Sequence, residues 1–290
     1  MALKTVGLLS PGEMGHVVAK VLIDQGMPVV SCLENRSELT QSLAKQVGIH
    51  RVESYNQLVI ESDIILSILV PAEAKKVAEK VVLATNTTDN QLIYVDCNAI
   101  APNTTKSINQ IITEAGNQFI DAGIIGPPPR EKTSTRFYAS GKEASKFEVL
   151  KNYGLDIRIV GPEIGQASGL KMCYAALTKG TAALSTELLV AASKMGLIKS
   201  LIEEFKLSQA QSYNALKHSL PSMPTKANRW VGEMEEIAKS FEDVGLTPKI
   251  FQGAAELYKF VGKSFLADET FESRDKNRTL TEMIDILKDT

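Results

Sequence analysis

The chain has 290 residues, of which 44% are hydrophobic and 23% are charged, and its formal net charge is −2. This length has room for two domains, and the hydrophobic content is sufficient for a buried core. The small net charge provides no basic surface of the kind that binds nucleic acid or anionic membranes, so we expect neither partner.

The compartment is predicted from three observations. Cys32, Cys97 and Cys173 each lie in an apolar run, which predicts buried free thiols in a reducing environment. The first apolar run is too short for a signal peptide, and no stretch of transmembrane length is free of charges. The sequence therefore predicts a cytoplasmic protein without a membrane segment.

The N-terminal half begins with the pattern of a nucleotide-binding turn. Residues 5–9 are predicted to form a buried parallel strand, and a helical pattern ends at Gly26. Glycines between such elements let the backbone approach a pyrophosphate, and the helix N-terminus supplies N–H donors. Gly12 and Gly15 match the second and third glycines of the dinucleotide fingerprint, and Ser10 stands where the first would fall. The predicted cofactor contacts in this turn are Ser10, Pro11, Gly12, Glu13, Met14 and Gly15.

The second predicted strand, residues 28–33, ends in Glu34-Asn35-Arg36-Ser37. An acid at this position favours a free ribose 2′-hydroxyl, whereas an arginine with a hydroxyl neighbour favours a 2′-phosphate. The sequence contains both, and the Asn-Arg-Ser run favours NADP, with NAD possible. The structural alternative is a solvated polar turn after a strand.

Strand and helix patterns continue to alternate through the first half. Strands are predicted at 62–70, 92–97 and 119–122, helices at 73–83 and 102–116, and edge strands at 137–139 and 157–160. Such repeats build a Rossmann-type, doubly wound parallel sheet, which is an α/β fold with ligands at the carboxyl ends of its strands. We therefore expect the 123–129 loop and Ala72 at the cleft, with cofactor contacts from Leu69, Val70, Pro71 and Asn98.

A long helix is predicted over residues 165–196, because no proline interrupts a stretch that is apolar on nearly every face. It would connect a dinucleotide-binding domain, 1–163, to an all-α substrate and dimerisation domain, 164–290. Further helices are predicted at 197–205, 208–218, 229–244 and 248–265, with a peripheral charged tail after Phe271. Since so apolar a helix needs cover on all sides, we expect a homodimer.

Lys171 is out of place on this helix. It lies near the helix N-terminus, where the dipole disfavours a cation, and its neighbours Leu170, Met172 and Cys173 are apolar. Both conditions favour a neutral amine, which would make Lys171 a usable proton donor near neutrality. The structural alternative is a lysine that reaches out to solvent.

Several segments occur in the order of a known family: Gly12-x-x-Gly15, Asn35-Arg36-Ser37, Leu69-Val70-Pro71, Val95-Asp96-Cys97-Asn98, Phe119-Ile120-Asp121-Ala122, Ser140-Gly141 and Gly165-x(5)-Lys171. The sequence resembles the β-hydroxyacid dehydrogenase and 6-phosphogluconate dehydrogenase superfamily, which includes the imine reductases. The GLLSPGEMG start and Arg229-Trp230-x-x-Glu233-Met234 resemble an uncharacterised branch with a divergent C-terminal domain.

The resemblance implies that Lys171 is the catalytic lysine. Ile125 replaces the family serine that grips a substrate carboxylate, and Tyr174 replaces the asparagine that assists proton transfer. The family lysine near the C-terminal helix is here Gly232. We therefore predict Lys171 and Tyr174 as catalytic residues and no metal; the predicted substrate contacts are Gly123, Ile124, Ile125, Gly126 and Arg229.

The predicted function is an NADP-dependent oxidoreductase that transfers a hydride between nicotinamide and an alcohol or carbonyl carbon of a small molecule. The alternatives are an imine reductase-like enzyme that acts on C=N, and an NADPH-binding regulator without turnover. In the second half, Trp230 is predicted to be core, His218 solvated or capping, and Glu233, Glu235 and Glu236 a solvated face.

Overall fold

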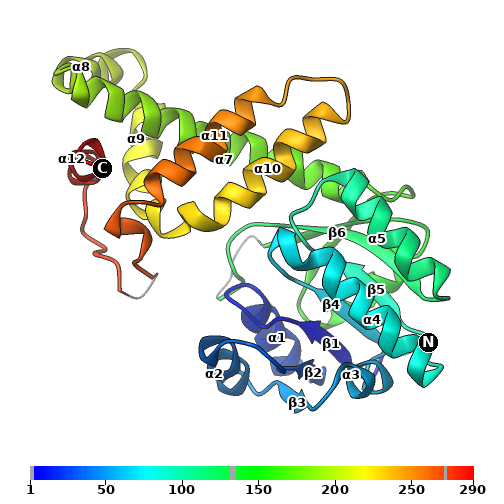
Figure 1. Ribbon diagram of the computed structural model, residues 1–290. Coiled ribbons are helices and arrows are strands. Elements are labelled where there is room, and N and C mark those ends of the chain that lie inside the picture. Colours follow the sequence, from blue (N-terminus) through cyan, green and yellow to red (C-terminus); the bar gives the residue numbers. More distant parts are fainter. Residues whose placement is uncertain (1–2, 131–134, 271–272) are drawn as a thin grey trace. The chain divides into compact units, whose positions relative to one another are not determined.

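The computed structural model describes residues 3–130, 135–270 and 273–290. The chain divides into two compact units, Met1–Met172 and Cys173–Thr290, which we call the first unit and the helical unit (Figure 1). The division falls inside the long helix α7 (Gln166–Lys194). The predicted domain limits place it just before this helix.

In the described residues, eight strands of the first unit form one sheet in the order β3-β2-β1-β4-β5-β6-β7-β8. The strands are β1 (Val6–Leu9), β2 (Val29–Cys32), β3 (His50–Val52), β4 (Ile64–Ser67), β5 (Ile93–Asp96), β6 (Gln118–Ile125), β7 (Arg136–Ser140) and β8 (Asp156–Gly161). The first six are parallel, β7 is antiparallel to β6, and β8 is parallel to β7. The order 3-2-1-4-5-6 is that of a dinucleotide-binding sheet, so the predicted Rossmann-type fold is confirmed.

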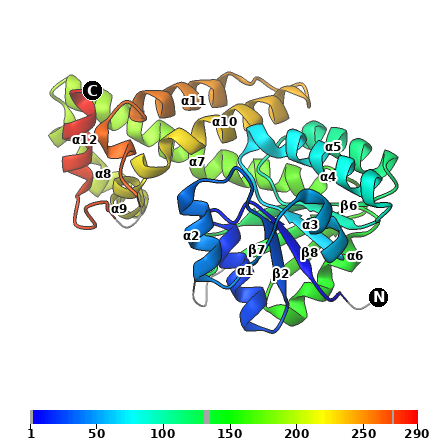
Figure 2. The same cartoon turned by 60° about the horizontal axis from the view of Figure 1, so that its bottom comes forward.

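Helices pack against both faces of this sheet (Figure 2). They are α1 (Gly15–Asp24), α2 (Glu38–Gln46), α3 (Tyr55–Glu61), α4 (Ala74–Thr88), α5 (Pro102–Glu114) and α6 (Ala144–Phe147), with short 3-10 turns η1 (Pro71–Glu73) and η2 (Glu148–Tyr153). Leu8 and Leu66 share a buried cluster with α1 and α6, while Leu9 and Ile65 share the opposite cluster with α3, α4 and α5. Burial on both faces explains why the strands are apolar throughout rather than alternating.

Part of the first unit was not predicted from the sequence. Among the residues of α2 only Ala44 is buried, and two of the three residues of β3 are exposed, so neither carries a strong hydrophobic pattern. The predicted strand at 62–70 is shortened to β4. Conversely, β6 extends to Ile125, so residues 123–125 of the predicted cleft loop belong to a strand.

The second half of the chain is helical, as predicted. After α7 come α8 (Ile198–Ser208), α9 (Ala210–Ser219), α10 (Ala227–Glu242), α11 (Lys249–Val261) and α12 (Leu280–Lys288), with 3-10 turns η3 (Leu220–Ser222), η4 (Pro224–Lys226) and η5 (Phe265–Ala267). In both views α10 and α11 run side by side (Figures 1 and 2). In the described part of the chain, none of the helices is long and apolar enough to span a membrane.

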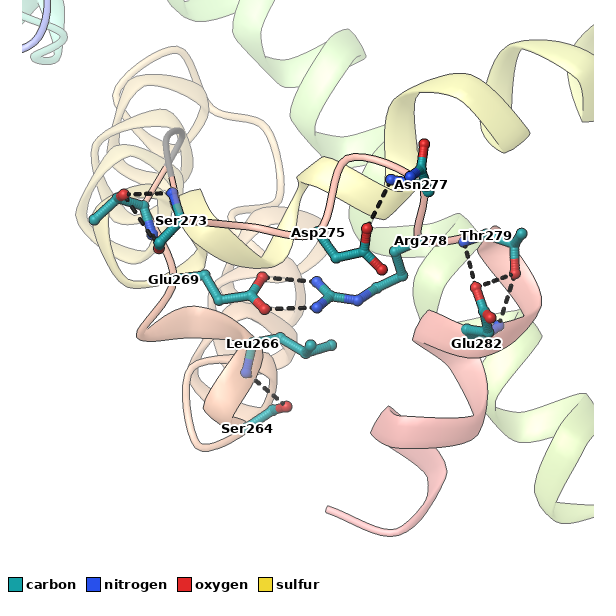
Figure 3. A network of polar contacts seen from close by, with 10 residues as sticks. Ser264, Leu266, Glu269, Ser273, Asp275, Asn277, Arg278, Thr279 and Glu282 are labelled. Carbon is teal, nitrogen blue, oxygen red and sulfur yellow. Dashed lines mark hydrogen bonds and ion pairs between the residues drawn. The ribbon is translucent and has the colours of Figure 1, made fainter.

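The prediction of a peripheral tail was wrong. Phe271 itself lies outside the described residues, but α12 buries Leu280, Met283, Ile284 and Leu287. Figure 3 shows how the segment before it is fixed: Arg278 donates to both carboxylate oxygens of Glu269, at 2.7 and 2.5 Å. A capping box between Thr279 and Glu282 then starts the helix. The many charges of the tail obscured the amphipathic pattern of this short helix.

Among the predictions about burial on α7, the one for Cys173 was wrong. The helix has a buried side that includes Ala183 and Leu189, but Leu177 and Leu184 are 71% and 64% exposed in the single chain. Cys173 is an exposed free thiol, whereas Cys32 and Cys97 are buried. The helix α7 therefore presents an apolar side that the described residues leave exposed.

Candidate active site

The turn between β1 and α1 is tight, and its backbone is accessible at Gly12. The Gly12 N–H donates to the Ser10 carbonyl at 2.8 Å, and the His16 N–H donates to the Gly12 carbonyl at 3.0 Å. A Cβ at Gly15 would lie 2.8 Å from the Ser10 carbonyl oxygen, so only glycine lets the helix start this close to the strand. At Gly12, apart from the glycine and its two chain neighbours, no described atom lies within 4 Å of where a Cβ would be.

Ser10 replaces the first glycine of the fingerprint in conformation as well as in position. Its φ is 63°, in the left-handed region that glycine adopts without steric cost. His16, which was not predicted, is buried beside this turn with Nδ1 2.6 Å from the Gly12 carbonyl oxygen. A single histidine in an apolar helix gives no sequence signal that its side chain contacts the backbone of the preceding turn.

The end of β2 is built around Arg36. Asn35, with φ 56°, reverses the chain, and the half-buried Arg36 follows between exposed Glu34 and Ser37. The Ser37 hydroxyl accepts the Thr40 N–H at 3.3 Å and so caps α2. Ser37 therefore has a structural role in addition to its predicted role in cofactor binding.

Two residues that were not predicted lie beside Arg36. The Arg36 side chain is hydrogen-bonded to Tyr55, the first residue of α3; burial raises the pKa of Tyr55, and the arginine opposes this rise. Lys80 from α4 lies with Nζ 5.8 Å from the centroid of the Tyr55 ring. Arg36 and Lys80 thus bring two cations to one ring. Because these residues come from three separate elements, no local pattern could have predicted the group.

Asn98 joins the carboxyl ends of β4 and β5. It is 2% exposed. Its Oδ1 accepts the Leu69 N–H at 2.6 Å, and its Nδ2 donates to the Ser67 hydroxyl at 2.9 Å. The side chain therefore holds the predicted Leu69-Val70-Pro71 segment against the sheet, where Val70 is half exposed and Pro71 starts η1.

Asp96 ends β5 as a buried acid. It is 1% exposed, its Oδ1 accepts the Asn98 N–H at 2.9 Å, and its Oδ2 has no described hydrogen-bond partner. It lies directly opposite Asp121 of β6 in the strand register. Burial raises the pKa of Asp96 to about 7; the Asn98 hydrogen bonds oppose this rise and the charge of Asp121 adds to it.

Lys171 is anchored at the far end of β6. The lysine is half-buried, and its Nζ donates to the Ile124 carbonyl at 2.5 Å. At Gly123, a Cβ would lie 2.9 Å from both the Ala167 carbonyl oxygen and the Lys171 Cβ, so glycine lets α7 approach the strand. In the register, β6 continues from Asp121, the partner of the last residue of β5, to Ile125. Lys171 is therefore held at the carboxyl edge of the sheet, where ligands of such folds bind.

The other predicted substrate residues of the first unit differ in exposure. Ile124 and Ile125 are 5% and 3% exposed and pair with β7, while Gly126 is exposed with φ 119°. Among residues 123–126, glycine thus serves helix packing at one position and a turn at another.

Tyr174 and Arg229 belong to the helical unit. Tyr174 is 45% exposed and lies one turn after Lys171 on the same helix, so the two side chains share a face. The Arg229 Nε lies 3.7 Å from an oxygen of Glu233. Glu233 is buried and ion-paired with Lys179, so the prediction of a solvated face was wrong for this residue, whereas Glu235 is exposed and pairs with Lys259.

The remaining predictions in the helical unit concern aromatic and histidine side chains. Trp230 is half-buried, 5.3 Å edge-on from the Tyr258 ring. His218 is exposed, with Nδ1 2.7 Å from the Asn214 carbonyl oxygen, as predicted for a solvated histidine.

The residues of the first unit fit a nicotinamide dinucleotide. The open backbone at Gly12, next to the start of α1, suits a pyrophosphate, and the Arg36 group suits the ribose end. Within the described ranges, no three His, Cys, Asp or Glu side chains are gathered so that they could hold a metal ion.

Comparison with known proteins agrees with this geometry. Residues 5–157, more than half of the chain, match the NAD binding domain of 6-phosphogluconate dehydrogenase. The chain belongs to this family. Residues 192–261 match a domain of unknown function, DUF1932. Membership gives the first unit an NAD(P)-binding domain and supports an NAD(P)-dependent oxidoreductase.

Individual relatives extend the match over both units. The chain is 31% identical over 257 residues to an uncharacterised 28.5 kDa protein of Methanothermus fervidus, covering 88% of this chain and 98% of that protein. A solved structure of a conserved protein of unknown function, described as similar to 3-hydroxyacid dehydrogenases, is 30% identical with a TM-score of 0.66, covering 89% of this chain and 99% of that one. The imine reductase of Myxococcus stipitatus, solved with NADP+, shares the fold at 17% identity and a TM-score of 0.58, covering 98% and 100% of the two chains.

Proposed function

We propose that the protein is an NADP-dependent oxidoreductase that transfers a hydride between nicotinamide and an alcohol or carbonyl carbon of a small molecule, with Lys171 as general acid and base. The observation that carries the proposal is the position of Lys171. It is half-buried and held by the Ile124 carbonyl at the carboxyl end of β6, on the sheet edge that also bears the Gly12–Gly15 turn.

The cofactor and Lys171 would carry out different parts of the reaction. The bound cofactor supplies or accepts the hydride. Lys171 donates a proton to the developing alkoxide during reduction and removes it during oxidation. Its hydrogen bond to Ile124 fixes the direction from which that proton comes. Tyr174, one turn further along α7, shares this proton transfer or orients the substrate.

The preference for NADP rests on Arg36. Arg36 and Lys80 gather at Tyr55, and Ser37 lies next to Arg36 at the start of α2. Two cations suit a 2′-phosphate better than a neutral hydroxyl, although Glu34 in the same turn favours the hydroxyl. We therefore infer tighter binding of NADPH than of NADH, with NAD as the alternative cofactor.

The substrate class follows from Ile125 and Arg229. A buried isoleucine stands in the family position that grips a carboxylate, and it offers no charge or hydrogen bond to one. We infer a substrate with an apolar group or neutral carbonyl at that point, with Gly123, Ile124 and Gly126 beside it. Arg229, whose side chain is 43% exposed, is the residue we assign to an anionic group of the substrate.

Oxidation of NADPH by a matched panel tests the proposal. The panel pairs small β-hydroxy acids and their keto forms with the corresponding esters and ketones, and includes a cyclic imine. We expect turnover of the neutral carbonyls, and Lys171→Met should lower kcat about 10²–10⁴-fold while NADPH affinity stays nearly unchanged. A variant that retains full turnover would refute the role of Lys171.

Two other functions are separated by the same panel. Turnover of the imine alone would favour an imine reductase-like enzyme. Binding of NADPH without its oxidation by any carbonyl or imine would favour a regulator, which the loss of the family serine and asparagine at Ile125 and Tyr174 makes worth testing.

We also infer a homodimer in a reducing compartment such as the cytoplasm. Leu177 and Leu184 of α7, with Leu207 of α8, are more than 60% exposed in the single chain. Apolar side chains in such number favour cover by a second copy. The three cysteines are free thiols, which suits a reducing environment.

A further inference from the structure

The first turn of α7 is tied to β6 by one buried carboxylate. Asp121 is 1% exposed and accepts the N–H groups of Gly165 at 2.9 Å, Ala167 at 3.1 Å and Ser168 at 3.2 Å. These donors lie where a helix has N–H groups without partners inside the helix. A negative charge at this end also complements the helix dipole.

Ser140 completes the attachment from the neighbouring strand. It lies opposite Asp121 in the register of β6 and β7. Its hydroxyl donates to Asp121 Oδ2 at 2.9 Å and accepts the Ala167 N–H at 3.0 Å. Burial raises the pKa of Asp121, and hydrogen bonds from Ser168, Ser140 and Gly165 oppose that rise by favouring the charged form.

Three successive contacts along β6 connect this cap to Lys171. The Asp121 carboxylate accepts hydrogen bonds from the N–H groups at the start of α7. A Cβ at Gly123 would lie 2.9 Å from the Ala167 carbonyl oxygen, so this glycine lets the helix backbone come close. The Ile124 carbonyl accepts a hydrogen bond from Lys171 Nζ at 2.5 Å. Ala167 and Lys171 are four residues apart, so a rotation or shift of the capped turn moves the lysine with it.

We propose that Asp121 is a positioning residue for Lys171: through its cap on α7 it sets where the lysine amine lies relative to the end of β6. This inference rests on the proposed role of Lys171 for its functional meaning. The geometry it predicts can nevertheless be measured without substrate.

The experiment measures the reactivity of Lys171 in the full-length protein. Trace reductive methylation is followed across pH, and peptide mass spectrometry compares Lys171 with the exposed Lys45 as an internal reference. In Asp121→Asn we expect Lys171 to react about fivefold faster than in the unmutated protein, because loss of a charged cap frees the helix start. Ser140→Ala, a milder change, should raise the reactivity by a smaller factor. If Asp121→Asn does not fold, the Lys171 reactivity of Ser140→Ala tests the proposal in its place.

Asp96→Asn is the matched control. Asp96 is as buried as Asp121 and lies opposite it in the register, but the donor to its carboxylate is Asn98 and not α7. Lys171 reactivity should therefore stay unchanged in this variant. An unchanged Lys171 in both test variants, or an equal rise in the control, would overturn the proposal.

Turnover gives a second, separate readout. With any substrate that the panel identifies, Asp121→Asn should lower kcat and leave NADPH affinity unchanged, because the Gly12–Gly15 turn is not touched. If Lys171→Met leaves turnover intact while the labelling result holds, the acid–base role fails and the positioning of the lysine stands. If the labelling result fails while Lys171→Met is inactive, only the positioning fails.

Discussion

The raised pKa of Asp96 predicts a pH-dependent stability that a single substitution should remove. The ordinary pKa of an aspartate is 3.8, and burial raises that of Asp96 to about 7. Between these values the folded protein binds a proton that the unfolded chain does not. The stability due to this proton is fully present below pH 4 and is lost as the pH rises through 7.

The size of the effect follows from the shift. A change of about three pKa units at 1.36 kcal/mol each gives about 4 kcal/mol between pH 4 and pH 7. Asp96→Asn keeps the acceptor for the Asn98 N–H and removes the ionisation. The variant should therefore be close to the unmutated protein at pH 4 and increasingly more stable than it up to about pH 7, with little further change at pH 8.

Hydrogen exchange suits this measurement, because a chain with two units need not unfold in one step. Peptides that cover β5 and β6 report the local opening free energy once intrinsic exchange rates are corrected for pH. Asp24→Asn is the control, since Asp24 is an exposed partner of Lys20 on α1. If the difference between Asp96→Asn and the unmutated protein is flat across pH, the reasoning about this buried acid is refuted.

Three further predictions concern the cofactor, the turn and the assembly. NADPH should bind about tenfold more tightly than NADH, ~1.4 kcal/mol, and Arg36→Ala should erase most of that difference in a fluorescence titration; equal affinities in the unmutated protein would assign the preference to Glu34. Ser10→Gly should raise stability by about 1 kcal/mol, because glycine adopts a φ of 63° without strain, and an unchanged urea midpoint would contradict this. Light scattering should give a dimer mass at micromolar concentration, and a monomer mass would exclude the proposed cover of α7.

The sequence predicted those features that depend on local pattern. The apolar runs of the central strands, the glycines after β1 and the uninterrupted length of α7 all correspond to elements of the structure. The strands are recognisable locally because burial on both sheet faces requires apolar residues at nearly every position, and α7 is recognisable because no proline interrupts it.

Features that depend on distant neighbours could not be predicted in this way. Tyr55 and Lys80 come to Arg36 from separate helices. Glu233 is acidic like Glu235 and Glu236 nearby, and it is buried because Lys179 lies opposite it. In α12, the charged residues Glu282, Asp285 and Lys288 stand among four buried apolar residues and obscured their pattern. In each case the deciding contact comes from a part of the chain that a short window does not include.

Asp96 and Asp121 illustrate why residue type alone does not assign a role. Both are aspartates, both are 1% exposed, and they face each other on neighbouring parallel strands. Two negative charges in this arrangement repel, which disfavours ionisation of both aspartates at once. The aspartate that accepts more hydrogen bonds is the one whose charged form is favoured. Asp121 has the N-terminus of α7 and Ser140, whereas Asp96 has the Asn98 N–H and an Oδ2 without a described partner. Asp121, which caps the helix that carries Lys171, is therefore the aspartate that carries the negative charge, and Asp96 is the one that keeps its proton.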